Sequence, residues 1–373
     1  MDGTLRSSEK ASMIKLVAEG VECPNSINID RNTSQLIIDG QALVNSIGKP
    51  ATATTFGDLA ATFIDGVVHL ERPYVRVDIL FDRYHTKSIK SGTRCRRTRG
   101  AAPVRRDITS AAIPLPKNWK NFLALGDNKA DLARFLSQEV LQYVFNDIEF
   151  VVSGGLIHEE DVRSTNPESD VSSLAATNEE ADTRVVLHAV HSDADNIVIM
   201  ARDTDICLLL IHHFDKMTSS NVWMMSGTAK ERKYLPIHEI CNILPNVTED
   251  VSSGDEARYQ LFGVVKKPEA LPPTSDALRL HLLRCHYQVN VWENAHHARP
   301  EVMDPESYGW RLHQDEYIPI LMTLEPVPKA CTDILTYNCL SHCLKTMCTC
   351  KKNGLTCTKL CHRSHQCLNS SNA

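Results

Sequence analysis

Short apolar segments alternate with helical segments along much of this 373-residue chain, and this alternation constrains the fold most. β-branched and other apolar residues predict strands at residues 34–39, 74–81, 148–152, 196–200 and 221–225. Apolar residues at helical spacing predict helices at residues 54–70, 118–144 with a break at Gly126, 178–191, 206–213 and 275–296. Because parallel strands need helical crossovers, we expect an α/β fold with a mostly parallel sheet and helices on both faces.

Carboxylates follow several of the predicted strands or begin a predicted helix. In open α/β sheets, ligands bind outside the carboxyl ends of the strands, so these acids are expected to converge there. Carboxylates in one cleft repel one another unless a divalent cation neutralises them, and oxygen ligands suit Mg²⁺ or Mn²⁺. Two such ions can hydrolyse a phosphodiester. The candidate catalytic acids are Asp39, Asp82, Glu180, Asp182, Asp203 and Asp205.

A structural explanation of each acid stands beside the catalytic one. Asp39 followed by glycine is typical of a turn, and the acids that open a helix are typical caps that complement the helix dipole. For a single acid the structural role is the more common one. Their joint placement after several strands favours a shared site.

Two segments carry a resemblance to a known class of nucleases. NEEADTRVVLHA, at residues 178–189, and IVIMARDTDICLLLIHH, at residues 197–213, resemble the internal acidic region of PIN-like, flap-endonuclease-type nucleases. IIDGQALV and ILFDRYHTKSIK resemble the first and second acidic strands of that fold. The EEADTR, DTD, LPPTSDAL and terminal cysteine segments also resemble those of a family of uncharacterised, mobile-element-associated animal proteins, over about residues 37 to 367.

The resemblance implies a PIN-like, Rossmann-like domain in which the six candidate acids bind Mg²⁺ or Mn²⁺, with Glu179 as a further candidate. The family continues from a Leu-Pro into a Gly-Cys-Asp segment that contributes the last acidic ligand and a DNA-gripping helical element. Here Leu244-Pro245 runs almost directly into DEARYQLF, so the resemblance implies a truncated domain. We therefore expect weak or no catalysis.

Cysteines are concentrated near the C-terminus, where eight of the thirteen fall within residues 331–367. Closely spaced thiols in a reducing compartment are more often zinc ligands than disulfides, and zinc would supply the folding free energy that this poorly apolar segment lacks. The alternative is a thiol-rich tail without metal. The predicted zinc ligands are Cys339, Cys343, Cys348, Cys350, Cys357, Cys361 and Cys367.

This pattern resembles the CXC motif of tesmin-type DNA-binding proteins, in which nine cysteines hold three zinc ions. Tyr337 and Arg363 stand at two of the nine positions, and His342, His362 or His365 could complete the coordination. Nearby lysines give the segment a basic surface suited to phosphates. The resemblance implies DNA as a partner, with protein interaction as the alternative.

The remaining features limit the class of protein. A formal net charge of -6 argues against coating of nucleic acid along the whole chain, so any such contact would be local. No apolar run is long enough to span a bilayer, and the first residues lack the apolar core of a secretory signal. We expect an intracellular protein without membrane contact, nuclear rather than cytoplasmic. The basic loop at residues 88–107 is an import patch, a phosphate contact or a solvated loop.

Three segments are expected: a PIN-like domain at residues 30–245, a helical segment and linker at 255–330, and a CXC-like zinc module at 331–367. The leading hypothesis is a nucleic-acid-associated protein with a degenerate nuclease fold. The alternatives are an active Mg²⁺- or Mn²⁺-dependent flap-type endonuclease and a zinc-dependent DNA-binding or protein-interaction module. The pair His212-His213 is expected to serve packing or helix termination rather than metal binding.

Overall fold

The computed structural model describes residues 14, 17–71, 74–83, 104–143, 148–158, 160–227, 232–243 and 275–323. The chain divides into two compact units. One comprises Met1–Asp250 and Leu283–Pro319, and it contains the large sheet. The other comprises Val251–Leu282 and Ile320–Ala373, of which residues 275–282 and 320–323 are described. The seven predicted zinc cysteines and residues 88–103 of the basic loop lie outside the described residues.

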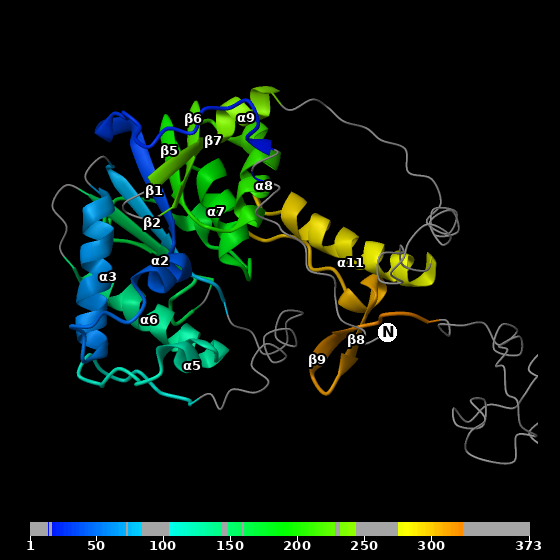
Figure 1. The fold of residues 1–373 in the computed structure, drawn as a ribbon, viewed down its shortest axis with the longest axis horizontal. Coiled ribbons are helices and arrows are strands. Elements are labelled where there is room, and N and C mark those ends of the chain that lie inside the picture. Colours follow the sequence, from blue (N-terminus) through cyan, green and yellow to red (C-terminus); the bar gives the residue numbers. More distant parts are fainter. Residues whose placement is uncertain are drawn as a thin grey trace, which may run out of the picture. The chain divides into compact units, whose positions relative to one another are not determined.

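A seven-stranded mixed sheet forms the centre of the first unit, with the strand order β4-β3-β2-β1-β5-β6-β7 (Figure 1). The five central strands are parallel, whereas β4 and β7 pair antiparallel at the two edges. From β1 the chain moves outward to β2 and β3, and it then returns to the other side of β1 with β5 and β6. The strands are β1 (Ser34–Asp39), β2 (Arg76–Leu80), β3 (Glu149–Ser153), β4 (Val162–Ser164), β5 (Asn196–Met200), β6 (Asn221–Gly227) and β7 (Arg232–Pro236).

Helices cover both faces of the sheet (Figure 1). Alternate residues of β1 point to opposite faces, so Leu36 and Ile38 join one apolar cluster while Ile37 joins the other. The first face packs against α2 (Gly40–Ile47), α3 (Phe56–Glu71), α5 (Trp119–Leu123) and α6 (Gly126–Gln142). The second face packs against α7 (Ala181–Val190), α8 (Thr204–His212) and α9 (Ile237–Ile243). The expected α/β fold with a mostly parallel sheet is therefore confirmed.

Helix α3 illustrates why these residues form these elements. Phe56, Leu59, Phe63 and Val67 recur at helical spacing, and each is at most 3% exposed. Burial of each such side chain contributes roughly 1.5–3 kcal/mol before the entropy of ordering is subtracted. Asp58 fixes the first turn of the helix, because its carboxylate accepts hydrogen bonds from the backbone N–H groups of Thr54 and Thr55.

A C-terminal segment returns to the helical layer of the sheet unit. Helix α11 (Ser275–Glu293) begins in the second unit, but from Leu283 onward the chain belongs to the first. A ring nitrogen of His213, Nε2, lies 2.7 Å from the carbonyl oxygen of Trp292, and the amide of Asn178 donates to the carbonyl of Ala295 at 3.3 Å. Residues 283–319 belong to the same unit as the sheet. This segment ends in a two-stranded hairpin, β8 (Trp310–His313) and β9 (Glu316–Pro319).

All five predicted strands are present, and so are the predicted helices, with bounds that differ by a few residues. The prediction of a turn after Asp39 was wrong, because α2 begins at the next residue. The short strand β4 was not predicted. The sequence reading also missed β7, α9 and the β8–β9 hairpin. These elements are short, and their apolar residues are too few to show a period.

No helix among the described residues is long and apolar enough to cross a membrane.

Candidate functional site: an acidic cleft at the carboxyl ends of the strands

A cleft of about 460 Å³ opens where the strands β1, β2 and β5 end. This is where the chain changes direction across the sheet, between β1 and β5, and ligands of open α/β folds bind at such positions. Five of the six predicted acids line the cleft. They are Asp39, Asp82, Glu180, Asp182 and Asp203. Asp205 does not line it and lies in the first turn of α8.

Asp39 is both the last residue of β1 and the N-cap of α2. Its carboxylate accepts a hydrogen bond of 3.0 Å from the backbone N–H of Ala42, which satisfies one of the free donors of the first turn. Gly40 allows this junction to lie against the end of β2. A Cβ atom at Gly40 would fall 2.5 Å from the ring of Phe81, the residue that precedes Asp82. The strand-to-helix turn thus brings Asp39 and Asp82 to one edge.

Asp82 connects the end of β2 with the beginning of α7. Its Oδ1 atom accepts a hydrogen bond of 2.8 Å from the backbone N–H of Ala181. A second connection follows, since the backbone N–H of Arg83 donates to the carbonyl of Glu179 at 2.8 Å. These bonds carry Glu180 and Asp182, on either side of Ala181, to the cleft.

Asp203 is the N-cap of α8, and its carboxylate accepts from the backbone N–H of Asp205 at 3.1 Å. The preceding residue, Arg202, is the one basic side chain among the described residues that line the cleft. Its guanidinium donates to the hydroxyl of Ser46 at 3.3 Å and to the carbonyl of Gly227 at 3.4 Å. The positive charge of Arg202 is therefore held by neutral partners beside the acids.

The negative charges of the cleft affect one another. The pKa of Asp39 is raised to about 6, chiefly by burial. The carboxylates of Asp82 and Asp203 also raise it, and the hydrogen bonds from Ala42 and Gln41 lower it. At neutral pH the ionised form of Asp39 is thus destabilised by its surroundings. A bound cation would relieve this repulsion.

The cleft fits a hard cation in its donor chemistry but not in its geometry. Carboxylate oxygens are the ligands that Mg²⁺ and Mn²⁺ prefer. Within the described part of the chain, however, no three His, Cys, Asp or Glu side chains lie close enough to hold one metal ion. The carboxylates of Asp39, Asp82 and Asp203 each accept a backbone N–H instead. The acids are gathered at one edge without a formed coordination site.

A second acid of β2, Asp78, has a structural role inside the fold. It is fully buried, and its carboxylate accepts from Arg76 Nε at 2.8 Å and lies 2.6 Å from Nδ1 of His188. Burial alone would raise the pKa of Asp78, but Arg76 and His188 hold it below its usual value. Burial likewise lowers the pKa of His188 against the opposing effect of Asp78. This network, Arg76–Asp78–His188, links β2 to α7 in the interior of the fold.

Sequence reasoning missed four polar residues that line the cleft, Gln41, Asn45, Arg202 and Thr204. Gln41 and Asn45 lie one turn apart on α2, and their side chains are joined by a hydrogen bond of 3.3 Å. Recognition of α2 would have revealed this pair. Arg202 stands within the ARDTD segment, so its position next to Asp203 was the available signal.

The predicted packing role of His213 agrees with its burial and its contact with Trp292. Burial also lowers the pKa of His213 to about 4, so its ring is neutral at pH 7. The described cysteines Cys23, Cys207, Cys241 and Cys285 are free thiols. No protein-family model and no curated protein matches this chain.

Proposed function

We propose that this protein associates with nucleic acid through a degenerate PIN-like nuclease fold with weak or no catalysis. The observation that carries the proposal is the cleft itself. Five acids from β1, β2, β5 and α7 line one cleft at the switch point of the sheet, yet the described residues include no three metal ligands close enough to share an ion. An acidic cleft that gathers carboxylates without coordinating geometry fits a nuclease-derived site with low metal affinity.

The strand order supports the PIN-like assignment. The parallel strands follow the order β3-β2-β1-β5-β6, with the acids after β1, β2 and β5. The resemblance of the EEADTR and DTD segments implies the same arrangement. The Gly-Cys-Asp segment of the family, which contributes a further acid, has no counterpart after Leu244-Pro245. This supports a loss of catalysis rather than of the fold.

The alternative is an active flap-type endonuclease, and the burial of Asp39 favours it. Mg²⁺ or Mn²⁺, when bound, would activate water and stabilise the leaving oxygen of a phosphodiester. Asp39, Asp82 and Asp203 would hold the ion, with Glu180 and Asp182 contributing from the start of α7. The carboxylates of Asp39, Asp82 and Asp203 would then each give up the hydrogen bond from a backbone N–H group, or bind that group and the ion together.

The C-terminal cysteines support a separate contribution to binding. We propose that the seven cysteines from Cys339 to Cys367 hold zinc, and that this module binds DNA or, in the alternative, a protein. The basic residues among them fit the phosphate backbone. A nuclear location accords with DNA as the partner.

The test uses the full zinc-loaded chain and a labelled flap DNA with Mn²⁺, beside an EDTA control. We expect DNA binding in a gel-shift measurement, little or no cleavage, and loss of binding when zinc is removed by a chelator. The variant Asp203→Asn removes a cleft charge, and Asp215→Asn removes an exposed charge outside the cleft.

Cleavage that survives in Asp215→Asn but is abolished by EDTA and by Asp203→Asn would establish the active endonuclease instead. Absence of DNA binding by the folded chain would contradict the nucleic-acid proposal itself.

A further inference from the structure

Residues 292–298, which follow the last turn of α11, cover part of the helical layer on the second face of the sheet, and we call them the strap. Ala295 of the strap packs with Val186 of α7 and Leu209 of α8, and Trp292 packs against the same cluster. Val186, Leu209 and Ala295 are each at most 1% exposed. The strap therefore keeps an apolar contact between α7 and α8 away from water.

The strap is fastened by hydrogen bonds near both of its ends. At the far end, the backbone N–H of Thr177 donates to the carbonyl of Ala298 at 2.8 Å. At the near end, Nε2 of His213 lies 2.7 Å from the carbonyl oxygen of Trp292. A carbonyl oxygen only accepts, so Nε2 carries the ring hydrogen. The other ring nitrogen of His213, Nδ1, is buried and has no hydrogen-bond partner among the described residues.

A closed strap is therefore compatible only with a neutral His213. A proton on Nδ1 would place a charge and an N–H group without an acceptor in the interior, which is costly. Burial accordingly lowers the pKa of His213 to about 4, against the raising effect of the Trp292 carbonyl. Because Nδ1 is covered while the strap is closed, His213 takes up a proton only when the strap opens.

Further basic side chains surround His213. The ring centroids of His213 and His296 are 5.1 Å apart, and those of His212 and His213 are 4.8 Å apart. His297 stacks on His296 at 3.9 Å, and Nζ of Lys216 lies 3.4 Å from each ring nitrogen of His296. His212, Lys216 and His296 each disfavour a charge on His213. Like-charge repulsion within this cluster grows as the other rings take up protons.

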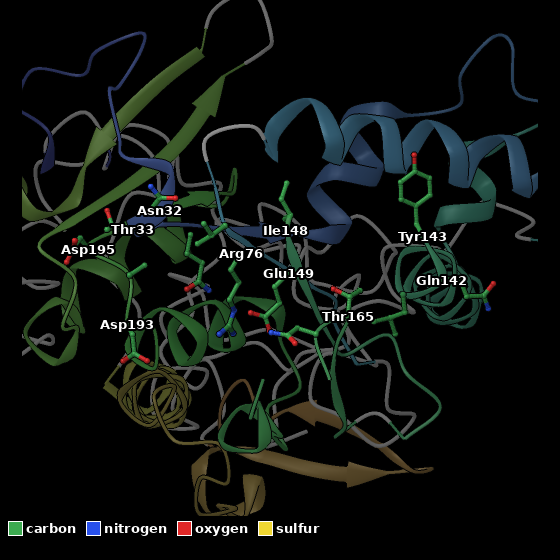
Figure 2. A pocket seen from close by; sticks show the side chains of 15 residues that line it. Asn32, Thr33, Arg76, Gln142, Tyr143, Ile148, Glu149, Thr165, Asp193 and Asp195 are labelled. Atoms are coloured by element: carbon green, nitrogen blue, oxygen red, sulfur yellow. The ribbon is translucent and has the colours of Figure 1, made fainter. Parts of the chain in front are cut away.

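The other charged groups near the strap do not offset this repulsion from within the fold. His191, at the end of α7, adds to it, because it lowers the pKa of His296. Asp215, Glu293 and Asp193 are exposed, so water and salt weaken their attraction for a charge on His213. Asp193 also lines a cavity of about 810 Å³ at the amino ends of the strands with Arg76, whose pKa it raises (Figure 2).

We propose that the strap is a pH-sensitive latch, which opens when His213 takes up a proton from the solvent. Opening uncovers Val186 and Leu209, and it breaks the hydrogen bond from Thr177. Thr177 precedes the residues that carry Glu180 to the acidic cleft, so the latch links the pH of the solvent to the order of the chain at that cleft. The latch does not depend on the function proposed for the cleft.

The direction of the pH dependence follows from the two states of His213. The ordinary pKa of an exposed histidine is 6.5, and the closed strap lowers the pKa of His213 to about 4. Between these values the open state binds more protons than the closed state. Closure is thus fully favoured above about pH 6.5 and is lost progressively as the pH falls toward 4. For one proton, the opening equilibrium constant rises by up to about tenfold per pH unit.

The test is hydrogen–deuterium exchange of the full chain, read by mass spectrometry at several pH values from about 4.5 to 7. Each rate is divided by the rate of an unprotected amide at the same pH, which gives a protection factor. In the wild type we expect the protection of Thr177 and of the strap to fall by several-fold to about tenfold per pH unit below 6.5. The protection of β1 and β5 should stay constant.

His213→Gln is the decisive variant, because its amide can donate to the Trp292 carbonyl in place of Nε2 but cannot take up a proton. Its protection factors should not change with pH. Lys216→Gln removes one repelling charge and should reduce the total fall. His158→Gln, at an exposed histidine outside the cluster, is the matched control and should behave as the wild type does.

Three results would overturn the latch. They are constant protection of the strap in the wild type, an equal fall in His213→Gln, and a fall in β1 and β5 equal to that in the strap. Thermal melting shows whether each variant folds. If His213→Gln does not fold, Lys216→Gln decides the question, because Lys216 is exposed. A reduced fall in that variant supports the latch, and a fall equal to that of the wild type contradicts it.

Discussion

The acidic cleft and the Arg76–Asp78–His188 network both place aspartates on β1 or β2, yet their charges are compensated in different ways. Asp78 is fully buried and is held by a guanidinium and an imidazole, which lower its pKa. Asp39 is partly buried and is held by backbone N–H groups beside two other carboxylates, and its pKa rises to about 6. Compensation by a guanidinium and a hydrogen-bonded imidazole inside the fold is typical of a structural acid. An acid that lacks such compensation is suited to bind a cation from outside the chain.

The same chemical change should therefore have opposite effects at the two positions, and the larger effect is expected at Asp78. Asp78→Asn removes the charge that matches Arg76 inside the fold. Loss of one partner of a buried pair typically lowers the free energy of unfolding by about 3–5 kcal/mol. Urea unfolding at pH 7 measures this, with Asp215→Asn as the exposed control. A loss below about 0.5 kcal/mol, the range of surface substitutions, would contradict the structural role of Asp78.

At Asp39 the same substitution should stabilise the protein at neutral pH. The folded pKa of about 6 lies above the ordinary value of 3.8 for an exposed aspartate, so the folded state binds more protons between these values. Stability attributable to Asp39 is thus present below about pH 4 and is lost as pH rises through 6. Asp39→Asn keeps an oxygen for the Ala42 N–H and should raise the free energy of unfolding at pH 7 by on the order of 2–3 kcal/mol.

The pH dependence gives the control for this prediction. Unfolding of the wild type and of Asp39→Asn is measured at several values between pH 4 and pH 8. The difference between the two should shrink toward zero at the acidic end, where both side chains are neutral. A difference that stays constant with pH would show that packing, rather than charge, separates the variants.

Gly40→Ala tests how the cleft is assembled. The added Cβ would lie 2.5 Å from the Phe81 ring, and overpacking of this kind destabilises by about 1–3 kcal/mol. The matched control is Gly66→Ala, within α3. The Cβ added there would meet its nearest neighbour, the side chain of Ile47 in α2, at 3.5 Å. That variant should be neutral or more stable by roughly 0.5–1 kcal/mol. Thermal melting measures the stability of both variants. Equal melting temperatures would contradict the close contact at Gly40.

The smallest expected effect is that of Mn²⁺ on stability. A cation that binds only the folded state stabilises it by mass action, by about 0.4 kcal/mol when its concentration equals the dissociation constant. We expect a small rise in melting temperature for the wild type and none for Asp203→Asn. An equal rise for both would place the metal elsewhere in the chain. A large rise for the wild type would favour the active endonuclease.

The sequence predicted the parallel strands well, because segments such as NIVIM are buried on both faces and read as continuous apolar runs. It also predicted five residues of the cleft, since strand ends meet at one edge of a parallel sheet. It did not predict that Asp39 caps a helix, because an aspartate followed by glycine can begin either a turn or a helix.

The return of the chain at the end of α11 has a consequence for synthesis. His213 completes its contact only with Trp292, which follows it by 79 residues. At roughly 5–20 residues per second, a ribosome needs about 4–16 s to make that stretch. During this interval the strands of the sheet are already available, while the ends of α7 and α8 lack their cover. The last part of this unit to be synthesised is therefore the part that closes it.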